Sequence, residues 1–367
     1  MLTAQDSFWM AHALRLAEQG LNTTSPNPRV GSVVVQGDTM VGQGWHQRAG
    51  EPHAEVLALR AAGEKARGAT IYITLEPCGH HGRTPPCVDI LIAAGVRRVV
   101  AAVQDPNPMV AAGRGITKLR SAGIEVVCGL MEAAARELNI GFFARMTRGM
   151  PWVRSKIAMS LDGRTALHNG LSQWITCPAA RQDVQQWRAR SCAVLSGIGT
   201  VLADDPQLNV RDIETSRQPL RVVLDSQLRL PLSARILQAP GAVVYTATED
   251  GKKIAALEKS GACVVLLPDA NRRVDLMAAL HDLAASGCNE VLVEAGSALN
   301  GALLQAGLVD ELVLYLAPQL LGDRARGMAQ LGEYISLDQH LALVWQDVRQ
   351  VGKDLRIVAR VIKGENV

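Results

Sequence analysis

The 367-residue chain has few aromatic side chains and no marked excess of charge of either sign. Phe, Trp and Tyr make up 4% of its residues, and 38 Lys and Arg nearly balance 35 Asp and Glu, giving a formal net charge of +3. Nucleic-acid-binding grooves combine clustered basic residues with stacking aromatics, and the sequence contains no such basic run. The composition therefore argues against a nucleic-acid substrate and leaves small anionic substrates open.

The sequence also lacks the marks of membrane insertion and of secretion. No apolar stretch approaches the roughly 20 residues that cross a bilayer, and charged residues interrupt the first predicted helix, unlike the apolar core of a signal peptide. The seven cysteines are odd in number and widely scattered, whereas small secreted domains carry dense, even disulfide frameworks. We expect a cytoplasmic protein with no membrane association.

The length predicts two domains, each with its own core. Strands of four to eleven residues alternate with helical patterns, which indicates an α/β fold in both halves. Thr147 to Pro151 interrupts this alternation, so we predict domains at 1–147 and 148–367. Helices are expected at 6–19, with Asp6 or Ser7 as the cap, and at 53–66, 88–94, 115–122, 131–145, 179–190, 251–260, 275–286 and 297–306. Strands are expected at 30–35 and up to 45, and at 70–75, 96–103, 124–127, 152–159, 193–197, 220–225, 242–246, 262–267, 290–294, 310–317, 341–351 and 355–362.

The strongest motif lies in the N-terminal half and predicts a zinc site. His53-Ala54-Glu55 begins a helix, Pro77-Cys78 follows a strand, and Cys87 comes after eight further residues. One imidazole and two thiolates suit zinc and leave a fourth position for a water, whose pKa the metal lowers. Glu55, two residues after the proposed ligand, is then the carboxylate that moves protons. The alternative is a degenerate site with buried structural cysteines.

The His-x-Glu and Pro-Cys pattern is the signature of zinc nucleoside deaminases, in which two residues usually separate the cysteines. The longer loop, together with Pro26-Asn27-Pro28 and Asp105-Pro106-Asn107-Pro108, resembles the riboflavin-pathway deaminases over nearly all of residues 5–145. The resemblance implies a cytidine-deaminase-like three-layer domain. It also implies that four residues hold the pyrimidine and its ribose phosphate: Asn27, His46, Arg83 and Asn107. Without it, Asn27 and Asn107 could simply be turn residues beside prolines.

The C-terminal half lacks the G-x-G-x-x-G run of a Rossmann domain, which argues against that dinucleotide fold. It does contain an apolar strand at 291–293 that leads through Glu294-Ala295-Gly296 to a helix beginning near Ser297. The amides at a helix N-terminus can bind a phosphate. Any strand-to-helix connection can use glycine, so this turn alone is a weak indication.

Further segments strengthen the prediction for this half. Residues 156–164, 172–176 and 199–211 resemble the riboflavin-pathway reductases, and the likeness covers about residues 150–365. It implies a dihydrofolate-reductase-like fold and reduction of a ribosylamino to a ribitylamino group by NADPH. The implied catalytic residues are Lys156, Asp204 and Glu294. The implied substrate residues are Ser172, Arg188, Leu208 and Arg211, and the implied cofactor residues are Ala158, Trp174, Thr200, Asp204, Gly296 and Ser297.

Three of these residues have simpler explanations. Lys156 could be a solvated strand residue, Asp204 a cap near Pro206, and Arg188 an exposed charge on its helix. This half also has Ala295 where the family commonly has glycine, which adds a methyl group beside the proposed cofactor.

Taken together, the sequence predicts a bifunctional enzyme of riboflavin biosynthesis that uses one zinc ion per chain and NADPH. It would deaminate 2,5-diamino-6-(5-phosphoribosylamino)pyrimidin-4(3H)-one to the uracil and then reduce the ribosyl chain. We expect a small-molecule pyrimidine ribose phosphate as substrate, no nucleic acid or membrane partner, and a homo-oligomer, with a dimer favoured. Two alternatives remain: a nucleic-acid deaminase with a binding module, and a non-catalytic zinc-stabilised scaffold that binds a pyrimidine phosphate.

Overall fold

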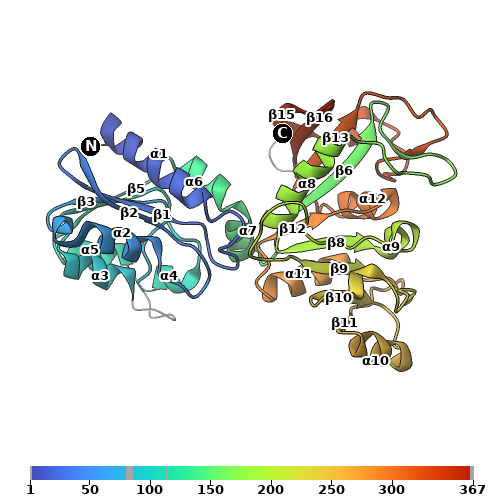
Figure 1. Ribbon diagram of the computed structural model, residues 1–367, viewed down its shortest axis with the longest axis horizontal. Helices are drawn as coiled ribbons and strands as arrows, with labels where there is room; N and C mark the ends of the chain where they lie inside the picture. Colours follow the sequence, from blue (N-terminus) through green and yellow to red (C-terminus); the bar gives the residue numbers. More distant parts are fainter. Residues whose placement is uncertain (1, 80–85, 113–114, 364–367) are drawn as a thin grey trace. The chain divides into compact units, whose positions relative to one another are not determined.

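The computed structural model describes residues 2–79, 86–112 and 115–363. The chain divides into two compact units, Met1–Met150 and Pro151–Val367 (Figure 1). The division falls three residues after the expected boundary at residue 147. Each unit has its own sheet.

Unit 1 contains a five-stranded sheet in the order β2-β1-β3-β4-β5, in which the first three strands are antiparallel and β3, β4 and β5 run parallel. Helices α1 and α6 lie on one face, and α2, α3 and α5 on the other (Figure 1). The result is a three-layer arrangement with a sheet buried on both sides. The strands are β1 (Gly31–Gln36), β2 (Thr39–Trp45), β3 (Thr70–Ile73), β4 (Arg98–Ala101) and β5 (Glu125–Cys128). The helices are α1 (Ala4–Glu18), α2 (Ala54–Ala62), η1 (Gly63–Ala66), α3 (Cys87–Ala94), α4 (Pro108–Ala112), α5 (Gly115–Ser121), α6 (Glu132–Leu138) and α7 (Ile140–Arg148).

Glycines allow the helices to approach the antiparallel strands closely. A Cβ placed on Gly31 would lie 2.0 Å from the carbonyl oxygen of Ala13 in α1, and one on Gly42 would lie 2.2 Å from that of Ala58 in α2. No side chain fits at either distance. The two glycines therefore set how closely α1 and α2 pack on β1 and β2, and α2 carries the first residues of the site.

Unit 2 is built on a nine-stranded sheet in the order β11-β10-β9-β8-β12-β6-β13-β16-β15, in which the first seven strands are parallel and the last two form an antiparallel hairpin. The short strands β7 and β14 pair separately. The strands are β6 (Trp152–Ser160), β7 (Arg164–Ala166), β8 (Ala193–Gly197), β9 (Leu220–Leu224), β10 (Ala242–Thr246), β11 (Ala262–Leu266), β12 (Glu290–Val293), β13 (Glu311–Ala317), β14 (Arg326–Gly327), β15 (Leu343–Val351) and β16 (Asp354–Val361). The helices are α8 (Pro178–Arg190), α9 (Ile198–Asp204), η2 (Arg235–Leu237), α10 (Gly251–Lys259), α11 (Leu276–Ala285), α12 (Ser297–Gln305) and η3 (Leu337–Gln339).

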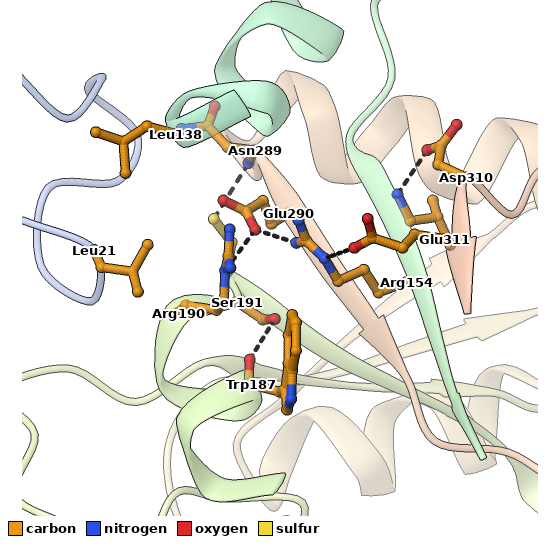
Figure 2. A network of polar contacts seen from close by, with 12 residues as sticks. Leu21, Leu138, Arg154, Trp187, Arg190, Ser191, Asn289, Glu290, Asp310 and Glu311 are labelled. Atoms are coloured by element: carbon orange, nitrogen blue, oxygen red, sulfur yellow. Dashed lines mark hydrogen bonds and ion pairs between the residues drawn. The ribbon is translucent and has the colours of Figure 1, made fainter. Parts of the chain in front are cut away.

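A buried ion network joins the amino ends of the three central strands of this sheet. Arg154 of β6 is fully buried and pairs with Glu290 of β12 and Glu311 of β13 (Figure 2). Arg190, at the end of α8, binds the same Glu290 carboxylate at 3.0 Å. Side chains two residues apart on a strand share a face, so Lys156 lies on the same face of β6 as Arg154, farther toward the carboxyl end.

The structure corrects two expected helices of unit 1. The first helix is capped by Thr3, while Asp6 is the third helical residue and completes a capping box with it; the expectation of Asp6 or Ser7 as the cap was wrong. The helix expected at 131–145 is interrupted at Asn139, whose side chain accepts the N–H of Arg29 at 2.7 Å and donates to the carbonyl of Arg29 at 2.9 Å. These bonds hold Asn139 outside helical geometry, and two helices form in place of one.

Helix α9 was not expected, although its residues 198–204 contain the Gly199-Thr200 motif. Within the described part of the chain, no helix combines the length and the hydrophobicity needed to cross a membrane.

Candidate active sites

Three side chains predicted to bind zinc converge in unit 1. His53 Nδ1 lies 3.1 Å from Cys87 Sγ and 3.7 Å from Cys78 Sγ, and the three ligand atoms lie within 4.8 Å of one another. Zinc bonded to nitrogen at about 2.0 Å and to sulfur at about 2.3 Å in a tetrahedron needs ligand atoms roughly 3.5–4 Å apart. The observed separations and the donor set therefore fit one zinc ion with an open fourth position.

Helix ends position two of these ligands. His53 is the N-cap of α2, and Cys87 is the first residue of α3, while Cys78 lies in the loop after β3. The backbone N–H of Cys87, at the start of α3, donates to Cys78 Sγ at 3.3 Å, so the positive end of this helix favours a thiolate at Cys78. The pKa of Cys78 is lowered to about 4, chiefly because its sulfur accepts hydrogen bonds from the thiol and the backbone N–H of Cys87. The pKa of His53 is raised, first by its hydrogen bond with Cys78.

Glu55 lies in the first turn of α2 and is buried, with 4% of its surface exposed. Burial raises the pKa of its carboxyl group, although the charge of His53 and a hydrogen bond with Cys87 oppose the shift. The carboxylate therefore lies beside the ligand cluster and away from bulk water. Glu55 was predicted to lie near the zinc ligands without being one of them, and its position in the structure is compatible with that prediction.

Asn27 and His46 lie together at the edge of the same cluster. Asn27 Nδ2 is 3.0 Å from His46 Nε2, and His46 Nδ1 is 3.1 Å from the carbonyl oxygen of Pro52. Because a carbonyl can only accept, Nδ1 carries the proton and Nε2 accepts from Asn27. Burial lowers the pKa of His46, so the ring is held neutral. Its centroid lies 5.4 Å from that of the His53 ring.

The remaining predicted substrate residues of unit 1 are less directly placed. Asn107 Oδ1 accepts the backbone N–H of Met109 at 3.1 Å at the start of α4. This contact is the turn role that the sequence left open for Asn107. Arg83 lies outside the described residues. A group that sequence reasoning left unassigned is Asp105, whose pKa is raised to about 7 by burial and by the charges of Glu76 and Cys78.

In unit 2 the structure brings Lys156, Arg188 and Glu294 together at the carboxyl end of the central strands. Arg188 of α8 binds both carboxylate oxygens of Glu294, with Nε to Oε1 at 2.5 Å and Nη2 to Oε2 at 3.0 Å. Lys156 Nζ lies 3.9 Å from Glu294 Oε2. Arg188 is buried and Lys156 is largely covered. The alternatives of a solvated lysine and an exposed arginine were therefore wrong.

The surroundings stabilise the charged form of Glu294 but not that of Lys156. Burial raises the pKa of Glu294, but Arg188 and Lys156 outweigh it and bring the value down to about 2. Burial lowers the pKa of Lys156, which Glu294 opposes and Arg188 reinforces. Glu294 is thus a fixed anion, and Lys156 is the group whose proton is most easily released.

Helix α12 holds the Glu294-Ala295-Gly296 turn in place. Asn300, fully buried, donates to the carbonyl of Ala295 at 3.1 Å and accepts from Ser155 of β6 at 3.0 Å. Gly296 is the N-cap of α12 and Ser297 its first residue. A Cβ on Gly296 would lie 3.8 Å from Thr200 Oγ1, so two predicted cofactor residues face each other.

Trp174 and Asp204, two of the predicted cofactor residues, lie on exposed segments that a hydrogen bond connects. Trp174 is 66% exposed and stacks under Arg181, whose guanidinium carbon is 4.5 Å from the ring centroid. Asp204 ends α9 and accepts a hydrogen bond from Gln173 at 3.4 Å. Ala158 lies on β6, and Ser172 is half-buried just before Gln173.

The two remaining predicted substrate residues differ in exposure. The Leu208 side chain belongs to the hydrophobic core, so only its backbone remains to contact a ligand. Arg211 is 47% exposed and lies 3.7 Å from Asp212. Arg188 and Arg211 were both expected to hold the substrate phosphate. Because the guanidinium of Arg188 is bound to Glu294, that of Arg211 is the more accessible of the two.

Comparison with known proteins matches each unit to a family. Residues 3–103 match the cytidine and deoxycytidylate deaminase zinc-binding region, and residues 151–357 match the RibD C-terminal domain. The riboflavin biosynthesis protein RibD of Escherichia coli K12 is 51% identical over 364 residues, covering 96% of this chain and 98% of that one.

Two solved structures agree along the whole length. Acinetobacter baumannii RibD, form 1, superposes with a TM-score of 0.91 at 48% identity, covering 98% of this chain and 99% of that one. A Thermotoga maritima diaminohydroxyphosphoribosylaminopyrimidine deaminase/5-amino-6-(5-phosphoribosylamino)uracil reductase gives 0.86 at 33% identity with the same coverage.

The fold and the sites define a bifunctional enzyme, a cytidine-deaminase-like domain followed by a dihydrofolate-reductase-like domain. The chain belongs to the RibD family, the deaminase and reductase of riboflavin biosynthesis. The predicted fold class and the two activities are confirmed. The second half is a reductase domain, so the alternative of a nucleic-acid-binding module was wrong.

Proposed function

We propose that unit 1 hydrolyses the amino group of 2,5-diamino-6-(5-phosphoribosylamino)pyrimidin-4(3H)-one, and that unit 2 then reduces the ribosyl chain of the uracil product with NADPH. The substrates are those implied by the name of the Thermotoga relative. The observation that carries the proposal is the convergence of His53, Cys78 and Cys87 beside the buried Glu55.

His53, Cys78 and Cys87 would hold one zinc ion in unit 1. Bound there, zinc supplies Lewis-acid activation of a water molecule at neutral pH. Glu55 would move two protons in turn, one from the water to the ring nitrogen and one from the resulting hydroxyl to the departing amine, because its burial beside the cluster keeps these protons from bulk solvent. Neutral His46 would hold the side-chain amide of Asn27 in place, and the remaining N–H and the oxygen of that amide would orient the pyrimidine.

In unit 2, NADPH supplies a hydride when bound. Lys156 would give a proton to the ring oxygen of the ribosyl group as its bond to the anomeric carbon breaks, which leaves an iminium carbon able to accept the hydride; burial makes that proton easier to release. Glu294 keeps the ammonium group oriented, and Arg188 keeps Glu294 oriented. Arg211 and Ser172 would hold the substrate phosphate, and Thr200, Gly296, Ser297, Ala158 and Trp174 the cofactor. Asp204, exposed at the end of α9, would contact both cofactor and sugar.

We also propose a homodimer in a reducing cytoplasm. The outer strand β15 carries exposed apolar residues, among them Trp345 at 61% and Val348 at 56%, a pattern that favours association over an open sheet edge. None of the seven cysteines forms a disulfide in the described structure. Light scattering coupled to size exclusion measures the mass of the particle, and a monomer at micromolar concentration would contradict the dimer.

The decisive experiment incubates the purified chain with the diamino substrate, with and without NADPH. Ammonia should be released without NADPH, and NADPH oxidation should begin only after deamination. Oxidation of NADPH by the diamino substrate at the same rate as by pre-deaminated substrate would contradict the order. Failure to release ammonia from zinc-loaded protein would contradict the deaminase assignment.

A further inference from the structure

A cavity of about 530 Å³ opens in unit 2 at the carboxyl ends of β8 and β9. Much of its wall is apolar and includes Ile198, Leu224, Leu299, Ala302, Met277 and Leu308. It adjoins the proposed cofactor turn, because Gly199 lines it and the next residue, Thr200, faces Gly296. In open α/β sheets, ligands bind at the carboxyl ends of the strands.

A rigid turn forms one rim of this cavity. Pro268 and Val274 pair across the turn, and Asp269 Oδ1 accepts the backbone N–H groups of Asn271 at 2.8 Å and of Arg273 at 2.7 Å. Val274 donates its N–H to Ser226 Oγ at 3.0 Å, which fixes the turn to the end of β9. The backbone of Arg273 is thus held in place beside the cavity.

The guanidinium of Arg273 remains available. The residue lines the cavity, is exposed, and makes no side-chain ion pair or hydrogen bond with any described residue. The two carboxylates of the lining are used differently: Asp269 holds the turn, and Asp275 Oδ1 caps α11 by accepting the N–H of Ala278 at 3.0 Å. Arg273 is therefore the charged side chain of the lining left to meet a ligand.

We propose that Arg273 binds the 2′-phosphate of the cofactor's adenosine ribose, with the adenine against the apolar wall, and thereby selects NADPH over NADH. The proposal rests on the proposed reductase function. A guanidinium matches a phosphate dianion in charge and in donor geometry. Sites for the non-phosphorylated cofactor instead offer a carboxylate to the ribose 2′-hydroxyl, and both carboxylates here already accept backbone N–H groups.

The chain offers a matched control in Arg272, an exposed neighbour that is absent from the cavity wall. Arg273→Gln and Arg272→Gln remove the same charge from the same turn, and each leaves an uncharged polar side chain. Steady-state reduction of the deaminated substrate is measured for both variants in the full-length chain with NADPH and with NADH. Direct binding of 2′,5′-ADP and of 5′-AMP, measured by isothermal titration calorimetry, reports recognition of the phosphate separately from catalysis.

Loss of a charge-assisted contact should lower kcat/KM for NADPH about 10-fold to 100-fold in Arg273→Gln, mainly through KM. With NADH the change should stay within about twofold, as should all constants of Arg272→Gln, since long-range charge effects at an exposed site are screened. The preference of the wild type for 2′,5′-ADP over 5′-AMP should disappear only in Arg273→Gln. An unchanged thermal midpoint and unchanged deamination exclude misfolding.

Equal losses with both cofactors, equal losses in both variants, or no loss in Arg273→Gln would each overturn the assignment of Arg273. A wild type that uses NADPH and NADH equally well would overturn it as well. These results leave the reductase itself in place. A wild type that oxidises neither cofactor with the deaminated substrate is a different result, because it contradicts the proposed function of unit 2.

Discussion

Arg188 and Glu294 form a two-point ion pair across 106 residues of chain, in which the guanidinium of α8 binds both oxygens of the carboxylate that follows β12. Lys156 approaches the same carboxylate from β6 at 3.9 Å. Glu294 therefore joins a helix to two strands at the point where the sugar would be reduced. Its ionisation depends on Arg188, because burial alone would favour the neutral acid.

The first prediction concerns this pair. Arg188→Met should reduce kcat for ribosyl reduction by about tenfold or more, because a buried, unpaired carboxylate takes up a proton and no longer orients Lys156. The acid limb of the pH profile should move upward, since the pKa of Glu294 rises from about 2 once its main counter-charge is gone.

Arg188→Lys provides the control for this experiment. It should recover part of the rate and return the acid limb toward lower pH, because it restores the charge without the second hydrogen bond. A higher KM for substrate in Arg188→Met, with an unmoved pH profile, would show that Arg188 contacts the phosphate directly.

The second prediction concerns Glu55. Glu55→Gln should lower the rate of deamination by about 100-fold to 10,000-fold, the usual contribution of a positioned general acid and base. Reduction of pre-deaminated substrate should remain within about twofold of wild type. Zinc content is measured in parallel, because the variant should still bind the metal through His53, Cys78 and Cys87. Deamination at the normal rate would remove Glu55 from the mechanism.

A third prediction follows from the ligand cluster. Removal of metal by a strong chelator should abolish deamination, leave reduction intact, and be reversed by zinc added to about one equivalent. Cys78→Ser should likewise abolish deamination and leave reduction intact, and about one equivalent of added zinc should not restore its deaminase activity. Cys263→Ser, at an exposed cysteine of unit 2, serves as the control and should behave as wild type. Full deamination in protein with far less than one zinc per chain would contradict the site.

The fourth prediction concerns the stability of unit 1. Asp6 is buried at 2% exposure and accepts hydrogen bonds from Arg98 at 2.7 Å and Tyr72 at 2.8 Å. Burial would raise the pKa of Asp6, but these bonds and those from Thr3 lower it from 3.8 to about 2. A shift of this size corresponds to about 2 kcal/mol of folding free energy above pH 4, lost as the pH falls toward 2.

Asp6→Asn should therefore lower the free energy of unfolding of unit 1 by about 2 kcal/mol at pH 7, and the difference from wild type should vanish near pH 2. Denaturant titrations at several pH values measure it. Asp89→Asn removes a carboxylate from a half-exposed ion pair with Lys118 and should cost under about 0.5 kcal/mol. A pH-independent loss in Asp6→Asn would mean that packing, rather than charge, explains the effect.

The fold was largely predictable from sequence because its parallel strands are short apolar segments separated by helical patterns. The cluster of His53, Cys78 and Cys87 was predictable because two short motifs, His-x-Glu and Pro-Cys, mark it along the chain. The interruption at Asn139 was not, since it depends on a pairing with Arg29 that is 110 residues away. The partnership of Arg188 and Glu294 was missed for the same reason: each residue has ordinary local surroundings, and only the sheet order brings them together.

His53 caps the start of α2 and Cys87 is the first residue of α3, so the predicted metal would join the starts of two helices that are otherwise separate in sequence. Binding to the native state alone raises the free energy of unfolding by mass action. The free energy of unfolding of unit 1 would then rise with the concentration of free zinc, so the ion that serves the chemistry would also hold together the two helices that present its ligands.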